Sequence, residues 1–330
     1  MIPFPKCLYI RRGELRVGSY IIRRLLMLIP VFIVVAIVAF SILHIIPGSP
    51  AAVMLGAEAT TDQIDKMNKD LGLDKPLLEQ FYLWSLGLLK GDFGDSYYIN
   101  RPVLGLIFEK MPVTISIAII AELVAILLAV PLGVFSAVKH NTVYDQLFMT
   151  IAVFGVAIPS FWLGIMFILI FSVTLRWFPV QGYIAINDSI TGWIMHLFLP
   201  ALALGFSHAG LIARMTRSSM LEVLSADYIR TLRSKGLAEK DVVFKHALKN
   251  SILPVVTVIG LSFTTLLGGA LIIETVFAMP GIGRLMLSSI QRRDYPIIQG
   301  VLIIFAIICV IMNLLVDLLY VYLDPRIKYN

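Results

Sequence analysis

Residues 214–254 read RMTRSSMLEVLSADYIRTLRSKGLAEKDVVFKHALKNSILP, and this polar stretch lies between two apolar runs. From Arg214 to Lys249 it carries eight Lys or Arg residues and four Asp or Glu residues. The runs on either side, residues 193–214 and 252–275, are long enough to cross a bilayer as helices, which takes about 20 residues. The pattern predicts a charged loop that connects two transmembrane helices.

The whole chain shares this apolar character. Of its 330 residues, 58% are hydrophobic and 15% are charged, and the mean hydropathy is +0.88. Soluble domains carry about 25% charged residues, and so few charges cannot cover a globular surface. Composition therefore excludes a soluble enzyme, a disordered chain and a secreted disulfide scaffold.

Six runs are apolar over a length that spans a membrane. They cover about residues 21–46, 112–138, 147–175, 193–214, 252–275 and 296–323. In the first run, the stretch Leu25–Ile46 follows Arg23 and Arg24, but it is too long for a signal peptide and has no small-residue cleavage site. We therefore interpret it as an uncleaved anchor.

The Lys and Arg residues orient these spans. With the N-terminus in the cytoplasm, the inside segments 1–24, 139–146, 214–249 and 324–330 hold 17 basic residues, and the outside segments hold 10. Because the inside segments are also shorter in total, the positive-inside rule favours this orientation, with both termini cytoplasmic. The net charge of +6 is then explained by cytoplasmic loops, and nucleic acid is not expected as a partner.

The predicted organisation has four parts. Residues 1–46 form a cytoplasmic arm and the first span, 47–111 an external insert, 112–323 a five-helix transmembrane core with the cytoplasmic loop 215–250, and 324–330 a cytoplasmic tail. The insert is expected to form small helices, because Thr60 and Gln63 have the spacing of a capping box and Leu77–Lys90 is a helical run that ends at Gly91. It either caps the membrane domain or offers a docking surface to an external partner.

Within the loop, the residues predict two helices separated by a glycine. A short helix is expected from Ser225–Asp227 to Lys235, because Gly236 can adopt the conformation that ends a helix. Residues 238–250 are expected to form a second helix. Such an elbow can insert into a groove on a partner protein, whereas composition alone would equally allow a solvated, positively charged loop.

Motifs for catalysis and cofactor binding are missing from the sequence. It contains no G-x-x-x-x-G-K-[ST], G-x-G-x-x-G, C-x-x-C or H-E-x-x-H pattern, and its five His residues lie in different segments. No metal site is expected. The longest cytoplasmic segment is too short for a nucleotide-binding domain of about 100 residues, so ATP-driven transport would need a separate ATPase chain.

One carboxylate lies well inside a predicted span. Glu122 would cost about 2.5–3.5 kcal/mol at mid-membrane, so it is a candidate pathway residue, or it lies nearer an interface or pairs with a neighbouring helix. Glu274 lies near a span end and is interpreted as interfacial.

The stretch 214–254 resembles the cytoplasmic coupling loop of binding-protein-dependent ABC importer permeases. The likeness is closest to the B-type permease subunit of the dipeptide, oligopeptide and nickel family, and it covers nearly the whole chain. The other motifs that carry it are IIPGSP (45–50), LGLDKP (71–76), KGDFGDS (90–96), VFAMPGIGRL (276–285), QRRDYPIIQG (291–300) and NLLVDLLYVYLDPRI (313–327). Gly236 fits the glycine of the family's coupling motif, while Arg230–Leu232 replace its E-A-A triplet, as is typical of this branch.

The resemblance implies an all-α, polytopic type I ABC importer permease fold with six transmembrane helices. It implies three kinds of partner: a homologous second permease subunit, two ATPase subunits and an external solute-binding protein. The chain itself would be no enzyme and would bind no cofactor, because ATP and Mg would be held by the ATPases. The expected coupling contact consists of Asp227, Tyr228, Arg230, Arg233, Lys235, Gly236 and Leu237.

The resemblance further implies import of di- or oligopeptides across a bacterial or archaeal plasma membrane. Import of nickel or another small solute by the same architecture is the alternative within the class, and an ion-coupled secondary carrier is the alternative outside it. The outside turn at Pro280, Gly281 and Gly283 would belong to an external gate or meet the binding protein, although a Pro/Gly turn is also an ordinary tight connection.

Overall fold

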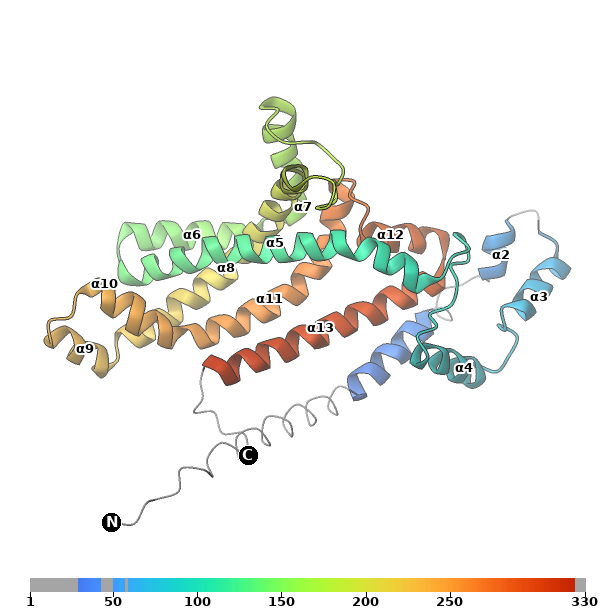
Figure 1. The fold of residues 1–330 in the computed structure, drawn as a ribbon, viewed down its shortest axis with the longest axis horizontal. Helices are drawn as coiled ribbons and strands as arrows, with labels where there is room; N and C mark the ends of the chain where they lie inside the picture. The colour runs from blue at the N-terminus through green and yellow to red at the C-terminus, as the bar shows by residue number, and fades with distance from the viewer. Residues whose placement is uncertain (1–28, 43–49, 57–58, 324–330) are drawn as a thin grey trace, which may run out of the picture. The chain divides into compact units, whose positions relative to one another are not determined.

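The computed structural model describes residues 29–42, 50–56 and 59–323 (Figure 1). The regular elements over these residues are all helices, apart from one isolated bridge between Asp95 and Pro102. The all-helical prediction is therefore confirmed. The predicted cytoplasmic arm, both ends of the first span and the tail 324–330 lie outside the described residues.

The chain divides into two compact units. Residues 1–103 and 292–330 make up the flanking unit, and residues 104–291 make up the core unit. The flanking unit holds the helix Ile29–Ile42, α2 (Pro50–Leu55), α3 (Thr61–Asp70), α4 (Leu77–Leu89) and α13 (Tyr295–Leu323). The core unit holds α5 (Val103–Val138), α6 (Val143–Ala157), α7 (Ser160–Phe167), η1 (Ile168–Thr174), α8 (Ile190–Leu224), α9 (Asp227–Ser234), α10 (Glu239–Asp241), η2 (Val242–Ala247), α11 (Leu248–Val276) and α12 (Ile282–Arg292).

Four helices of the described residues are long and apolar enough to cross a membrane. They are Val103–Val138, Ile190–Leu224, Glu239–Val276 and Tyr295–Leu319. The predicted span 147–175 is instead a pair, α6 and α7–η1, bent by 99°. Ile158 is extended at the break, because a residue before proline, here Pro159, is disfavoured in helical conformation. Of the first predicted span, only the apolar helix Ile29–Ile42 is described.

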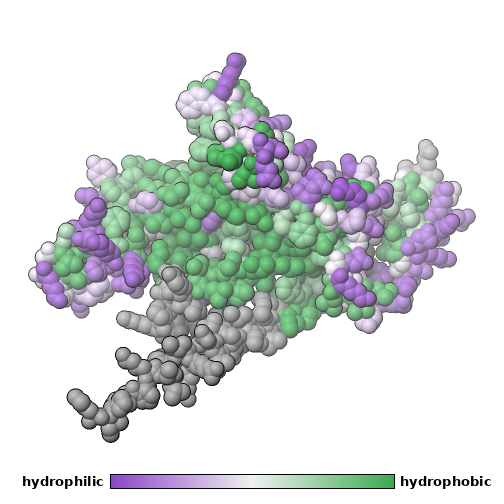
Figure 2. All heavy atoms as spheres, viewed as in Figure 1, coloured by the Kyte–Doolittle hydropathy of each residue, from purple (hydrophilic) through white to green (hydrophobic). Residues whose placement is uncertain are grey.

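Helix α8 is the central element of the core unit. It packs against α6, α7 and α11, and small residues allow the helices to approach closely. A side chain on Gly205 would overlap the backbone of Ala121 in α5, and one on Gly210 would overlap Ala152 in α6. Figure 2 shows hydrophobic surface over the long helices of this unit and hydrophilic surface at the α9–α10 end.

The predicted insert helices are present in the flanking unit. Helix α3 begins with the capping box of Thr60 and Gln63, and α4 packs Phe81 and Trp84 against Phe40, with ring centroids 5.3 Å and 5.7 Å apart. Beyond α4, the buried Asp294 accepts hydrogen bonds from Ser96 Oγ and from the backbone of Tyr97. Burial, together with the nearby Asp294, raises the pKa of Tyr97 to about 12.

Candidate functional site

The elbow predicted around Gly236 is present at one end of the core unit. Helix α9 ends after Ser234, and Gly236 follows with φ of +77°. The backbone N–H of Gly236 donates to Arg233 O at 2.9 Å, and that of Leu237 donates to Leu232 O at 3.3 Å. These two hydrogen bonds form a Schellman C-cap at the end of α9, in which Gly236 has the left-handed backbone conformation that glycine adopts without steric cost.

Helix α9 is attached to the core unit through one apolar face. Ile229 is completely buried, and Leu232 and Leu237 pack beside it. They contact a cluster built from α5, α8 and η2, namely Val134, Ala137, Met220, Val242, Val243 and Ala247. This apolar face holds α9 in place, so its opposite face points away from the core unit.

The opposite face carries the predicted coupling residues. Asp227, Tyr228, Arg230, Arg233, Lys235 and Gly236 are exposed. Leu237 is half-buried and belongs to the apolar contact instead. Tyr228 is held in position by Asn250, whose Nδ2 donates to the phenol oxygen at 2.9 Å. The exposed face therefore offers charged and aromatic groups to a partner.

A bidentate ion pair links the two sides of the elbow. Arg233 donates from Nε and Nη2 to the two carboxylate oxygens of Glu239, at 3.1 Å and 2.6 Å. These hydrogen bonds raise the pKa of Arg233 above its usual value. Because both side chains are about half exposed, the pair adds little stability, and its main effect is to fix the position of Arg233 relative to Glu239.

The second predicted helix, residues 238–250, is not a separate element. Glu239–Val276 forms one continuous helix, with a π-helical section at η2. The elbow therefore leads directly into a membrane-length helix.

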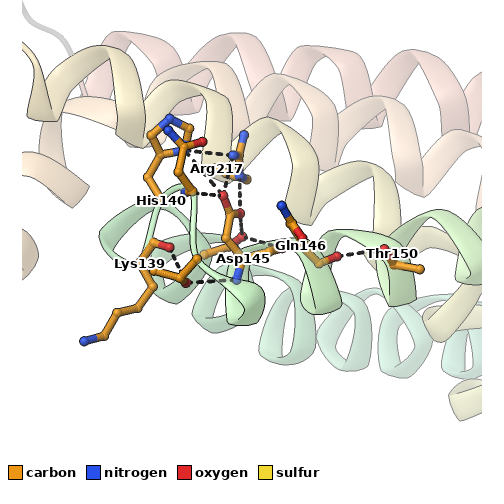
Figure 3. Close-up of polar contacts among 9 residues, drawn as sticks. Lys139, His140, Asp145, Gln146, Thr150 and Arg217 are labelled. Atoms are coloured by element: carbon orange, nitrogen blue, oxygen red, sulfur yellow. Dashed lines mark hydrogen bonds and ion pairs between the residues drawn. The ribbon is translucent and has the colours of Figure 1, made fainter.

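The sequence analysis did not predict an ion pair between the buried Asp145 and the partly buried Arg217 (Figure 3). Asp145, in the first turn of α6, is 3% exposed. Arg217 of α8 donates to it from Nε and Nη2, both at 2.7 Å, and Asn141 N donates at 3.0 Å. Ser136 Oγ also donates to Asp145, and Arg217 Nη2 lies 3.0 Å from His140 Nδ1. The cluster joins the α5–α6 turn to α8.

A hollow of about 410 Å³ links this cluster to the elbow. Its walls include His140 from the α5–α6 turn, Leu221 and Leu224 from α8, and the Arg233–Glu239 pair. The α5–α6 turn, the end of α8 and the elbow therefore form one continuous surface. The sequence signal for the cluster was Asp145, which lies three residues after Thr142, the N-cap of α6, and two residues before the predicted span 147–175.

Glu122 lies at the meeting point of three helices. It is 7% exposed on α5, and Ser262 Oγ of α11 donates to its Oε2 at 3.2 Å. Ser262 Oγ lies 3.3 Å from Nδ1 of His208 on α8. Glu122 is therefore buried among the helices, and a neighbouring helix supplies its partner, as one of the alternatives proposed. Whether it faces a pathway stays a prediction.

The turn at Pro280 is tightly anchored by Glu274. Pro280 is exposed, while Gly281 and Gly283 are buried. The Glu274 carboxylate accepts from Gly283 N at 2.7 Å and from Thr114 Oγ1. Any side chain on Gly281 would overlap that carboxylate. The Glu274 carboxylate is fully buried and caps the N-terminus of α12. Its position near a membrane interface stays a prediction.

No group of three or more His, Cys, Asp or Glu side chains suited to a metal ion occurs among residues 29–42, 50–56 and 59–323. The surface described above is suited to contact with another protein.

Comparisons with known proteins agree with this arrangement. The family described as "Binding-protein-dependent transport system inner membrane component" matches residues 129–329, and the N-terminal family of the same kind of system matches residues 17–118. The dipeptide transport system permease protein DppB of Alkalihalophilus pseudofirmus is 46% identical over 94% of this chain and 99% of its own length. The glutathione transport system permease protein GsiC of Escherichia coli K12 is 42% identical over the same shares.

A solved structure shares the fold. The MetNI methionine ABC transporter, in an inward-facing conformation, contains a chain that is 17% identical, with a TM-score of 0.55 over 66% of this chain and 96% of that one. The type I importer permease fold is thus confirmed. This chain belongs to the family of inner-membrane components of binding-protein-dependent transport systems.

Proposed function

We propose that this chain is one of two homologous permease subunits of an ATP-driven importer and forms half of a pathway for di- or oligopeptides. The observation that carries the proposal is its likeness to a dipeptide permease over 94% of its length. An external solute-binding protein would deliver the peptide. The complex would lie in a bacterial or archaeal plasma membrane with both termini of this chain in the cytoplasm.

Two ATPase subunits would dock on the cytoplasmic loops of the two permease subunits. In this chain, the docking contact would be made by Gly236 and the exposed face of α9. The ATPase subunits would hold ATP and Mg, and this chain would bind no cofactor and catalyse no reaction. Because the elbow leads directly into the helix Glu239–Val276, closure of the ATPases would move that helix between two states of the bundle. Glu122 would lie along the pathway, and the turn at Pro280 would belong to its outer end.

Substitutions of Gly236 test the coupling. Gly236→Trp adds bulk to the docking face at a residue with positive φ, and we expect loss of transport and of ATPase stimulation by the liganded binding protein. Gly236→Asn is the matched control, because asparagine tolerates this conformation, and it should retain most of both. Normal transport by Gly236→Trp in a fully assembled complex would contradict the proposal.

Two measurements separate the alternatives. Uptake of labelled peptides and of nickel by the same proteoliposomes decides the substrate class. A secondary carrier would transport without the ATPases and would stop when an uncoupler is added, whereas the importer requires ATP. The purified chain alone should show no ATPase activity.

A further inference from the structure

The cluster around Glu122 lies at the middle of three membrane-length helices. Nineteen residues of α5 precede Glu122 and sixteen follow it, and eighteen residues of α8 precede His208 and sixteen follow it. Ser262 and Thr265 of α11 complete the cluster. Ionisable groups at this depth carry a cost and mark functional sites.

Close helix packing builds the cluster. Gly205 lies one turn before His208 on α8, and a side chain there would overlap the backbone of Ala121, the residue next to Glu122. A Cβ on Gly269 of α11 would come within 2.7 Å of Leu204 on α8. These two glycines allow α5, α8 and α11 to approach where the polar side chains meet.

The hydrogen bonds around His208 fit a neutral imidazole with its proton on Nδ1. Ser262 Oγ uses its proton toward Glu122 Oε2, at 3.2 Å, and Thr265 Oγ1 donates to Ser262 O at 2.8 Å. Both hydroxyls can therefore only accept from His208 Nδ1, which lies 3.3 Å and 3.5 Å from them. The neutral imidazole then has its proton on Nδ1 and a lone pair on Nε2.

Two acceptor atoms of the cluster remain unused. Nε2 of His208 has no hydrogen bond among the described residues, and its ring is half-buried beside the exposed Thr265. Oε1 of Glu122 is buried without a hydrogen-bond partner. A buried carboxylate with an unused oxygen is costly, and a cationic hydrogen-bond donor at the exposed edge would offset that cost.

We propose that His208 contacts the α-ammonium group of the peptide during translocation and accepts a hydrogen bond at Nε2. Ser262 and Glu122 act as positioning residues. Ser262 holds the imidazole of His208 through Nδ1. The Glu122 carboxylate, on the far side of Ser262 from the imidazole, favours a positive charge beside Nε2. This inference rests on the proposed peptide transport. Exposed Thr265 and Leu211 flank the contact along α11 and α8.

The test compares two substitutions of His208 in the assembled importer in proteoliposomes. The probe is the peptide that the wild-type complex takes up fastest from a panel of labelled dipeptides and tripeptides. His208→Gln keeps an acceptor near the position of Nε2, whereas His208→Asn keeps only a donor near Nδ1. We expect His208→Asn to transport about tenfold less peptide per ATP hydrolysed, and His208→Gln to retain most uptake.

Stimulation of the ATPase by the liganded binding protein should require the same binding-protein concentration in both variants, because docking precedes the His208 contact. Val153→Ala, at an exposed position of α6 outside the cluster, should transport as the wild type does. Glu122→Gln should also lower uptake, since it removes the charge that favours the ammonium group. Normal uptake by Glu122→Gln would overturn the ammonium assignment.

Equal uptake by His208→Asn and wild type would overturn the inference, and so would equal losses in His208→Asn and His208→Gln. A measurement that leaves His208 intact covers the case in which these variants fail to assemble. In Thr265→Cys, peptide in an ATPase-arrested complex should slow maleimide labelling several-fold, and unchanged labelling would contradict the contact. If the wild-type complex takes up no peptide with ATP, the proposed function itself fails.

Discussion

At the residue scale, Asp145 is the hydrogen-bond acceptor that holds the α5–α6 turn against α8. Asp145 has four donors around it, from Arg217, Ser136 and the backbone of Asn141. Removing the buried carboxylate leaves Ser136 and the partly buried Arg217 without their acceptor, which costs more than the pair itself contributes.

We therefore expect Asp145→Ala to lower the unfolding free energy of the complex by about 3 kcal/mol. The apparent Tm in detergent should fall by several degrees. Asp227→Ala is the matched control, because it removes the carboxylate of an ion pair that is exposed. The Asp227 side chain is 97% exposed, and its Oδ1 lies 3.6 Å from Arg230 Nη1. That pair contributes less than about 1 kcal/mol, and equal shifts in the two variants would contradict the assignment.

Gly281 is a second residue whose substitution has a definite consequence. Gly281→Ala forces the Glu274 carboxylate away from Gly283 N and Thr114, so we expect a clear loss of thermal stability. Gly105→Ala is the comparison, since Gly105 is helical with open space around it. Alanine should be neutral or slightly stabilising there, by up to about 1 kcal/mol. A stable Gly281→Ala protein would show that Glu274 is free to move.

At the scale of elements, α9 depends on a single buried side chain. Ile229 is its only fully buried residue, and eight residues are too few for a helix to be stable alone. The exposed charges therefore reach a partner in a defined orientation only while Ile229 remains packed.

Ile229→Ala should cost about 2–5 kcal/mol of local packing. We expect it to uncouple ATP hydrolysis from transport and to make α9 sensitive to protease, although no exposed coupling residue is altered. Ser234→Ala on the exposed side of α9 should leave both properties unchanged. A fully coupled Ile229→Ala complex with a protease-resistant α9 would show that contacts other than Ile229 hold the elbow.

The elements also show where sequence patterns are sufficient. The capping box at Thr60, the helical run that begins at Leu77 and the stop at Gly236 each depend on residues a few positions apart, and all three are confirmed. The break at Pro159 and the continuity of Glu239–Val276 were missed. An apolar run has the same composition whether its helix is straight or bent. A proline within it is not decisive either, because α5 continues through Pro112 and Pro131 and α8 through Pro200.

At the scale of the whole molecule, the orientation of the chain is the main prediction that can be tested directly. Single cysteines would be introduced as Ser234→Cys in α9 and Lys69→Cys in α3, both at exposed positions, in a parent with Cys7 and Cys309 replaced by serine. An impermeant maleimide should label Lys69→Cys from the outside and Ser234→Cys only from the inside. Labelling of both from the same side would contradict the orientation.

By itself, the sequence determined the membrane class, the helical character and the charged elbow around Gly236. These follow from composition, from apolar run length and from short-range capping. Only the tertiary structure brought Asp145 to Arg217 and placed Glu122, Ser262 and His208 together. These side chains lie on helices far apart in the chain, and the close approaches at Gly205, Gly210 and Gly269 that join the helices have no local signature. The burial of Glu274 was decided in the same way, by α5 and α12 closing around it.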